Sequence, residues 1–449
     1  MLFTKEKLRK LIIPIIIEQI LAFTVGMADM VMVAQAGEAA VSGVSLIDSI
    51  GNLVICLFSA LATGGAVVSA QYLGKKEKEN AGMAANQLIL CVTVISTLIA
   101  AFCIVFYKQV IQVIYGTIDA DIRRNAEQYF YFIALSFPFL AIYNGSAALF
   151  RSMGNSKICM WISILMNVQN VIGNAVFIFG FHSGARGVGI STMLSRVTGA
   201  VLITMLLRNQ KLPFHIDRYF RFGIHLSMIQ KILYIGIPTG LENSMFQIGK
   251  LVLASLVSSF GRIETSANAV ANGITNFGII PGNAMGLALI TVVGQCIGAG
   301  DSRQAYENTK KLMKISYIAM IALNLVMALL STPLIHLYNL SPEVNAVAQR
   351  IILAHCLACC LIWVPSFVIP HALRASNDVR FTMVISIFSM WTFRICFGFI
   401  LGKYVGLKAL GVWIAMFIDW TFRGMVFVWR FKRKKLKVRK NKLKPQKKS

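Results

Sequence analysis

The chain has 449 residues, of which 57% are hydrophobic and only 14% are charged, and its mean hydropathy is +0.68. A water-soluble surface needs far more charge, so these values exclude a soluble globular protein. The net charge of +26 does not indicate nucleic-acid binding, because Lys and Arg gather at the ends of apolar segments and twelve of them lie in residues 430–448.

Apolar segments long enough to cross a bilayer core of ~30 Å follow one another along the chain. They predict an all-α membrane protein, because lipid cannot satisfy the backbone of an open sheet and no segment alternates with period two. The first six predicted spans are residues 11–36, 45–73, 84–107, 127–150, 158–180 and 188–207. The second six are residues 232–259, 267–297, 312–337, 349–372, 381–402 and 410–431.

An even number of spans places both termini on the same side of the membrane. Alternate assignment of the loops puts most of the 44 Lys and Arg residues on that side, which the positive-inside rule identifies as the cytoplasm. The basic N-terminus precedes an apolar segment too long for a cleaved signal, so we interpret it as a signal anchor. We expect the basic tail to lie on the anionic lipids of the inner leaflet.

The chain contains an internal repeat. A shift of 224 residues aligns residues 14–81 with residues 238–305 without a gap, and 13 of 68 positions are identical. Identical pairs include Pro14/Pro238, Glu18/Glu242, Gly37/Gly261, Ser42/Ser266, Asn52/Asn276, Gln71/Gln295 and Gly74/Gly298. Further along, Arg151 corresponds to Arg374 at an offset of 223. Two six-helix bundles of the same orientation are therefore expected, related by a pseudo-twofold axis along the membrane normal, with a cavity between them.

This repeat gives four predicted regions. They are an N-terminal lobe at 1–207, a cytoplasmic linker at 208–228, a C-terminal lobe at 229–431 and a basic cytoplasmic tail at 432–449.

Six motifs occur in order on this repeat, and together they carry a resemblance that covers the chain up to the tail. They are VGMADMVMVAQAG at 25–37, QYLG at 71–74, ALFRSMGNSK at 148–157, the pair Asn170 and Asn174, GVGISTMLS at 187–195 and GIPTGLENSMFQ at 236–247. The chain resembles the bacterial multidrug and toxic compound extrusion (MATE) transporters of the multidrug/oligosaccharidyl-lipid/polysaccharide flippase superfamily.

The resemblance implies a secondary active antiporter that exports amphiphilic, often cationic, small molecules in exchange for sodium ions or protons by alternating access. It implies a multi-pass protein of the bacterial inner membrane, and we expect a monomer without a cofactor. We do not expect an enzyme, since no nucleotide-binding or hydrolytic motif occurs. The alternatives are a lipid-linked precursor flippase of the same superfamily and a polytopic membrane enzyme; covalent turnover by the purified protein would favour the latter.

Asp29 is the first candidate for coupling, because a carboxylate in the middle of a span is costly unless it faces the bundle interior and binds an ion or a proton. Asn170 and Asn174 lie one turn apart and offer neutral oxygens to a hard cation, although interhelical hydrogen bonding is an alternative role. The resemblance assigns Asp29, Asn170, Asn174 and Thr192 to one cation site, with sodium as the expected metal ion. Without a cation we expect Asp29 to be protonated.

Two further features lie near the cytoplasmic end of the first span. Glu18 is about three turns from Asp29 on nearly the same face, and it either guards the cavity mouth or extends to the inner interface. Pro14 and Pro238 each remove a backbone hydrogen bond inside a span, so both are candidate hinges.

The second half departs from the first. Leu253 stands at the position equivalent to Asp29, so the cation site is not duplicated. Charges of both signs occur inside its spans, namely Glu242, Lys250, Arg394, Asp419 and Arg423. Glu242 and Lys250 are expected to face the cavity, and Arg394 and Asp419 are further candidates for a substrate contact. The alternative is a structural pair of Asp419 with Arg423, one turn apart, beside Arg394.

Overall fold

The computed structural model describes residues 3–116, 118–216, 223–338 and 340–434, and nearly all of them are helical. The predicted tail at 432–449 therefore lies almost wholly outside the described residues. The helices of the first half are α1 (Lys5–Ala34), α2 (Glu38–Gly74), α3 (Lys78–Tyr115), α4 (Ala120–Ser152), α5 (Ser156–Ala175) with the π-helical turn η1 (Val176–Gly180), and α6 (Gly184–Leu207).

The second half repeats this order with more interruptions. Its helices are α7 (Leu226–Ser258), α8 (Arg262–Gly278), α9 (Ile280–Gly298), α10 (Ser302–Leu329), α11 (Ser331–His336), α12 (Pro342–Ala358), α13 (Val364–Phe367), α14 (Ile369–Ala375), α15 (Val379–Ser389), α16 (Phe397–Phe399) and α17 (Lys408–Lys434). Its π-helical turns are η2 (Cys359–Trp363), η3 (Met390–Cys396) and η4 (Ile400–Tyr404).

These elements make twelve membrane spans, which confirms the predicted fold class. Eleven described helices are long and apolar enough to cross a bilayer. The twelfth span is α7, which has 33 residues but carries Glu242 and Lys250 among its apolar side chains. Most helices extend several residues beyond the predicted apolar segments, because their polar ends continue into the interfacial regions where charged side chains are solvated.

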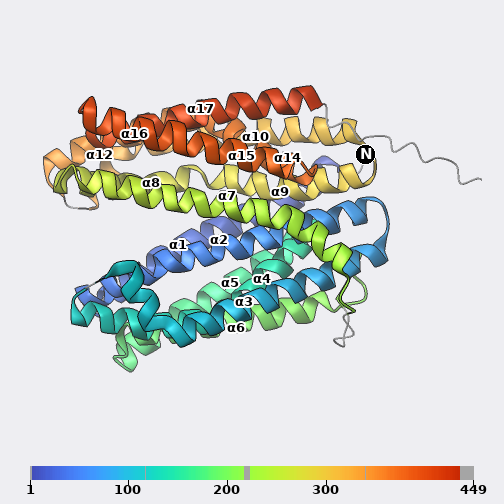
Figure 1. Ribbon diagram of the computed structural model, residues 1–449, viewed down its shortest axis with the longest axis horizontal. Helices are drawn as coiled ribbons and strands as arrows, with labels where there is room; N and C mark the ends of the chain where they lie inside the picture. The colour runs from blue at the N-terminus through green and yellow to red at the C-terminus, as the bar shows by residue number, and fades with distance from the viewer. Residues whose placement is uncertain (1–2, 117, 217–222, 339, 435–449) are drawn as a thin grey trace, which may run out of the picture.

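The two lobes form separate bundles that lie side by side (Figure 1). Helices α1–α6 make up one bundle and α7–α17 the other, and both the start of α1 and the end of α17 lie at the same end of the molecule. At the lobe interface α2 packs against α7 and α9. We call the end that carries the two described termini and the loop at Lys75 and Lys76 the basic end.

The repeat is visible in how equivalent helices begin. Gly37 precedes α2 with φ of +101° and Gly261 precedes α8 with φ of +100°. Side chains with a Cβ rarely adopt this conformation, so glycine at both positions lets the chain turn sharply between two spans.

Helical breaks concentrate in the second half. The span that begins with α8 is interrupted at Ile279, two residues before Pro281, and π-helical turns interrupt the later spans. Irregular backbone is tolerated at membrane depth where protein or a cavity surrounds it, and π-helical turns frequently mark functional positions. One of these turns, η3, carries Arg394.

Candidate functional site

The first lobe encloses a cavity of about 700 Å³, which we call the N-lobe cavity. Residues of α1, α2, α4, α5 and α6 line most of it, and Asn283, Leu287 and His371 of the other lobe contribute at its border. Its polar lining includes Glu18, Gln19, Asp29, Asp48, Asn52, Ser59, Tyr129, Tyr143, Asn144, Arg151, Ser163, Asn167, Asn170, Thr192, Ser195 and Arg196. Three of the four residues assigned to the cation site therefore face one space, and the fourth, Asn174, is buried directly beside them.

Hydrogen bonds join these four side chains in a row. Asn174 Nδ2 donates to Asp29 Oδ1 at 2.6 Å and lies 3.4 Å from Asn170 Oδ1. Asn170 Nδ2 donates in turn to Thr192 Oγ1 at 3.2 Å. Asn174 Oδ1 is buried and has no hydrogen-bond partner within the described part of the chain. An oxygen of this kind beside a carboxylate suits a hard cation, which prefers carboxylate and amide oxygens.

Three further polar residues of the same cavity, Asp48, Tyr129 and Arg196, were not predicted from the sequence. Asp48 of α2 accepts a hydrogen bond of 3.0 Å from the Tyr129 hydroxyl, and Arg196 of α6 donates to Ser136 Oγ at 2.7 Å. Like Asp29, Asp48 is a carboxylate of this cavity that does not pair with Arg151. The rule that singled out Asp29, a carboxylate inside an apolar span, applies equally to Asp48 and would have found it.

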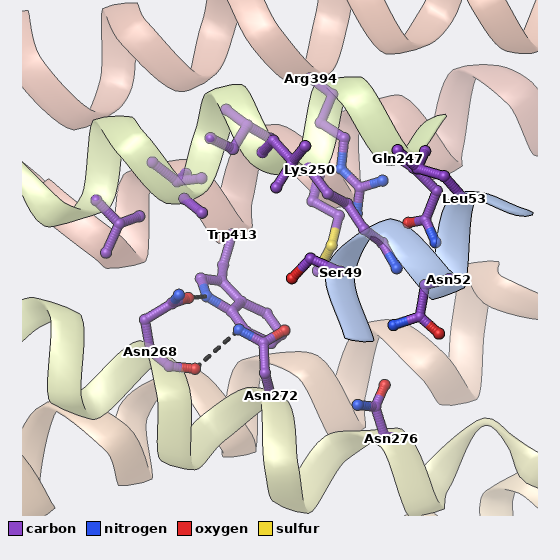
Figure 2. A pocket seen from close by; sticks show the side chains of 16 residues that line it. Ser49, Asn52, Leu53, Gln247, Lys250, Asn268, Asn272, Asn276, Arg394 and Trp413 are labelled. Atoms are coloured by element: carbon purple, nitrogen blue, oxygen red, sulfur yellow. Dashed lines mark hydrogen bonds between the residues drawn. The ribbon is translucent and has the colours of Figure 1, made fainter. Parts of the chain in front are cut away.

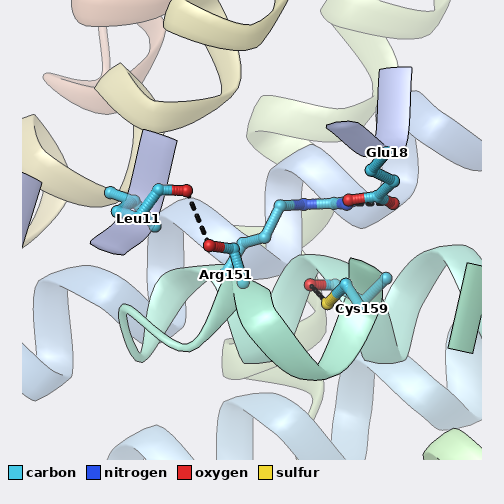
Figure 3. Close-up of polar contacts among 6 residues, drawn as sticks. Leu11, Glu18, Arg151 and Cys159 are labelled. Carbon is cyan, nitrogen blue, oxygen red and sulfur yellow. Dashed lines mark hydrogen bonds and ion pairs between the residues drawn. The ribbon is translucent and has the colours of Figure 1, made fainter. Parts of the chain in front are cut away.

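Glu18 does not extend to the interface. Arg151 Nη1, at the end of α4, lies 2.9 Å from Glu18 Oε1 and 3.1 Å from Oε2, and both side chains are largely buried (Figure 3). Glu18 still lines the N-lobe cavity, but as one half of an ion pair. A paired carboxylate is less available to a solute than the single carboxylate that we expected.

Glu242 makes the equivalent ion pair in the second lobe. Arg374 Nη2 lies 2.8 Å from Glu242 Oε2, and both residues are buried. Glu18 with Arg151 and Glu242 with Arg374 are therefore the same contact made twice. Glu242 is buried and does not line the N-lobe cavity, so the expectation that it faces a cavity is wrong for this space.

The predicted pair of Asp419 with Arg423 does not form. Within the described residues Asp419 has no ion pair within 4.0 Å; it accepts a hydrogen bond from the Ser389 hydroxyl. Arg423 donates to the backbone oxygen of Ser366 at 3.3 Å and lies over the ring of Phe367, 4.6 Å from its centroid. Adjacent turns bring the two charged residues close, but their side chains point to different neighbours.

Lys250 and Arg394 line a second cavity of about 410 Å³ (Figure 2), which we call the C-lobe cavity. It lies between α7, α8, η3 and α17 and is closed on one side by Ser49, Asn52 and Leu53 of α2. Figure 2 shows Lys250 and Asn52 extending into it from opposite lobes. Asn52 also lines the N-lobe cavity, so the two spaces adjoin at this residue of α2.

Pro14 and Pro238 lie inside α1 and α7. Pro14 leaves the carbonyl of Lys10 without its usual helical donor. The Ser156 hydroxyl of α5 lies 3.4 Å from that carbonyl oxygen and donates to the Leu11 oxygen at 2.6 Å. The interruption in α1 is thus bridged by a neighbouring helix.

Comparison with known proteins agrees with this architecture. The MatE family model matches residues 14–176 and again residues 238–400, so the second match begins and ends 224 residues after the first. Among curated proteins, the uncharacterized transporter YisQ of Bacillus subtilis is 29% identical over 93% of this chain and 92% of its own length. The probable multidrug resistance protein NorM of Thermotoga maritima is 25% identical over 93% and 90%, respectively. Among solved structures, a MOP superfamily transporter from Pyrococcus furiosus superposes with a TM-score of 0.90 over 96% of each chain at 19% identity.

Proposed function

Since this chain belongs to the MatE family and is a membrane transporter, we propose that it exports amphiphilic small molecules in exchange for sodium ions or protons. The family resemblance points to the exchange, and the probable multidrug resistance proteins among its relatives point to the class of cargo. We further propose that it acts in the cytoplasmic membrane of a bacterium, with its basic end in the cytoplasm.

The observation that carries this proposal is the contact between Asp29 and Asn174. A carboxylate, two amides and a hydroxyl converge in a cavity inside the membrane, and the Asn174 oxygen is free to bind a cation. One negative charge with neutral oxygens can hold sodium weakly, and a proton on Asp29 can replace it. Both coupling ions are therefore compatible with the same site.

Export follows if the coupling ion and the cargo favour opposite arrangements of the two lobes. A ligand that binds both arrangements equally shifts nothing, however tightly it binds. Glu18 with Arg151 and Glu242 with Arg374 tie α1 to α4 and α7 to α14, so each lobe is able to move as a unit.

The test is the substitution Asp29→Asn, which keeps the size of the side chain and removes its charge. Ethidium is added to the solution outside everted membrane vesicles that contain the protein, so that export appears as uptake into the vesicles. A sodium gradient or a proton gradient is imposed in separate experiments. We expect Asp29→Asn to lower gradient-driven ethidium transport by about tenfold to a hundredfold, the loss expected for a charged hydrogen-bonding partner. The matched control is Asp121→Asn, at an exposed carboxylate in the first turn of α4. Normal transport by Asp29→Asn under both gradients would place the coupling site elsewhere.

A further inference from the structure

The C-lobe cavity is the counterpart of the N-lobe cavity under the internal repeat. Asn52 and Asn276 are equivalent at the offset of 224 residues, and both face these spaces. Asp29, which lines the N-lobe cavity, corresponds to Leu253, which lines the C-lobe cavity. The two spaces are therefore comparable position by position.

This comparison shows that the charge of the cavity is reversed. Asp48 of the N-lobe cavity corresponds to Asn272 of the C-lobe cavity, so a second carboxylate is replaced by an amide. Conversely, the lining residue Gly26 corresponds to Lys250, which introduces a positive charge. Arg394 lies on the span that repeats α5, within one residue of the position equivalent to Asn170.

Among the described residues no carboxylate forms an ion pair with either cation of the C-lobe cavity, although the buried Asp419 is near enough to attract Arg394 electrostatically. None of the 16 residues that line it is Asp or Glu, and no acidic side chain of the described chain lies within 4.0 Å of the Lys250 or Arg394 nitrogens. Asp419, the acid of the neighbouring α17, is fully buried and accepts from the Ser389 hydroxyl.

Only 5% of the surface of Arg394 is exposed. Within the described residues, the hydrogen-bond acceptor of its guanidinium is the Met390 sulfur, at 3.8 Å. Its guanidinium stays charged and carries five donors, and buried charges are ordinarily paired. The ring of Phe246 faces both cations, at 4.8 Å from Arg394 Cζ and 5.3 Å from Lys250 Nζ. An aromatic face attracts cations weakly and does not replace a counter-ion.

The remaining walls of the cavity are amides, apolar side chains and the hydroxyl-bearing Ser49. Asn268 Oδ1 accepts a hydrogen bond of 2.9 Å from Trp413 Nε1, which leaves the Asn268 amide hydrogens as donors (Figure 2). Trp413 and Met416 of α17 supply apolar surface opposite α7. A cavity of about 410 Å³ with apolar walls and a few convergent polar groups has the size and character of a small-molecule site.

We propose that the C-lobe cavity binds the anionic group of an amphiphile, a carboxylate or a phosphate, between Lys250 and Arg394, with its apolar part against Trp413 and Met416. The planar fork of Arg394 suits two oxygens of such a group, and Lys250 adds a point charge. The cargo class of this transporter therefore includes organic anions or zwitterions. The coupling cation then binds in the N-lobe cavity, which contains Asp29 and Asp48.

The test measures equilibrium binding to the full chain in phosphatidylcholine nanodiscs by fluorescence anisotropy. The anionic probe is fluorescein, an aromatic carboxylate, and the cationic probe is ethidium. We expect the protein to bind fluorescein, and Lys250→Gln to weaken this binding about tenfold, as expected when one charged hydrogen bond is lost. Lys250→Glu, which reverses the charge, is expected to weaken fluorescein binding further and to strengthen ethidium binding.

The matched control removes two cations from exposed positions outside the cavity, in the double variant Arg262→Gln with Lys403→Gln. It is expected to bind fluorescein as the unmodified chain does. Because Arg394 is buried, the fluorescein binding of Arg394→Gln is compared only if its melting temperature is unchanged. Lys250 faces the cavity, so its two variants decide whether the cavity binds the anion. Equal fluorescein affinity in the unmodified chain and Lys250→Gln, or no binding to the unmodified chain, would overturn the proposal.

A second arm identifies the source of the anion. Nanodiscs with part of their phosphatidylcholine replaced by phosphatidylglycerol are expected to compete with fluorescein if the site takes a lipid phosphate, and not to compete if it takes a soluble organic anion. The inference rests on the proposed function only in naming the bound anion as cargo. Asp29-dependent ethidium export without fluorescein binding overturns this inference alone, whereas fluorescein binding without Asp29-dependent export overturns the proposed function alone.

Discussion

Gln71 and Gln295 occupy equivalent positions in the two lobes, and each donates a hydrogen bond across the interface between them. Gln71 Nε2 lies 2.9 Å from the backbone oxygen of Ala375, and Gln295 Nε2 lies 2.7 Å from that of Ser152. Ser152 ends α4 and Ala375 ends α14, which are themselves equivalent. We call these two hydrogen bonds the interlobe clasp. It joins the lobes beside the loops of the basic end, so the clasp must open if the lobes are to separate there.

Two glycines allow the clasp to form, and they give the first prediction. A Cβ on Gly298 would lie 1.9 Å from the backbone oxygen of Gln71, and one on Gly74 would lie 2.1 Å from that of Gln295. Helix backbone cannot move aside as a flexible side chain does, so Gly298→Ala must push α9 away from α2. We expect a lower melting temperature, by an amount that corresponds to about 1–3 kcal/mol of overpacking, together with slower ethidium export. Gly51→Ala is the control on α2, because its Cβ would meet nothing within 4 Å; equal behaviour of both variants would argue against a close contact at the clasp.

The repeated ion pair gives the second prediction. Removing Arg374 alone leaves the buried Glu242 carboxylate without its partner, which is expected to cost about 3–5 kcal/mol of stability. Replacing both residues, as Glu242→Met with Arg374→Met, is expected to cost less than Arg374→Met alone, because no unpaired charge remains. Melting temperatures in detergent give the comparison. Arg303→Met breaks an exposed pair with Glu307 and should change stability by less than about 1 kcal/mol; an equal loss in Arg374→Met would show that the buried pair is not special.

The sequence predicted the twelve spans and the repeat because apolar length and identical spacing are properties of the chain alone. The same repeat contains Glu18, Glu242, Arg151 and Arg374, yet it did not reveal that these residues pair. An offset relates equivalent positions of two lobes, but a contact inside one lobe depends on how helices far apart in sequence pack.

The candidate sites show the same limit. The row of Asp29, Asn174, Asn170 and Thr192 matches the set that the family resemblance assigned, whose role in coupling stays a prediction. Asp419 and Arg423 were interpreted as a possible pair from their spacing along one helix. Their side chains instead point to different partners, because Ser389 and Ser366 of neighbouring helices bind them. The domain boundaries also stay predictions.

The third prediction concerns Pro14. Pro14→Ala restores a donor to the Lys10 carbonyl, so α1 becomes a more regular helix and the contact of Ser156 with that carbonyl becomes less necessary. If bending at Pro14 is part of the transport cycle, the variant should export ethidium more slowly while its melting temperature stays the same or rises. Ile13→Ala, at a neighbouring side chain that faces outward, is the control. Export at the normal rate by Pro14→Ala, with normal expression, would count against a hinge.

The last prediction asks whether coupling requires Asp29 itself or only a negative charge in its cluster. Asn174 lies 2.6 Å from Asp29, so Asn174→Asp places a second carboxylate against the first. Two carboxylates at this distance repel each other, so either a bound cation offsets their charge or one of them takes up a proton. The variant should therefore bind sodium at lower concentration and show an altered dependence of export on pH. The double variant Asp29→Asn with Asn174→Asp moves the single charge by one hydrogen bond and leaves the number of oxygens unchanged. We expect it to recover part of the gradient-driven ethidium export that Asp29→Asn loses, because Asn170 and Thr192 still complete the site. Initial export rates measured over a series of sodium concentrations make the comparison. If the double variant is as inactive as Asp29→Asn while Asn174→Asp alone is active, the position of the carboxylate on α1, and not the charge of the cluster, is what links the ion to the movement of the lobes.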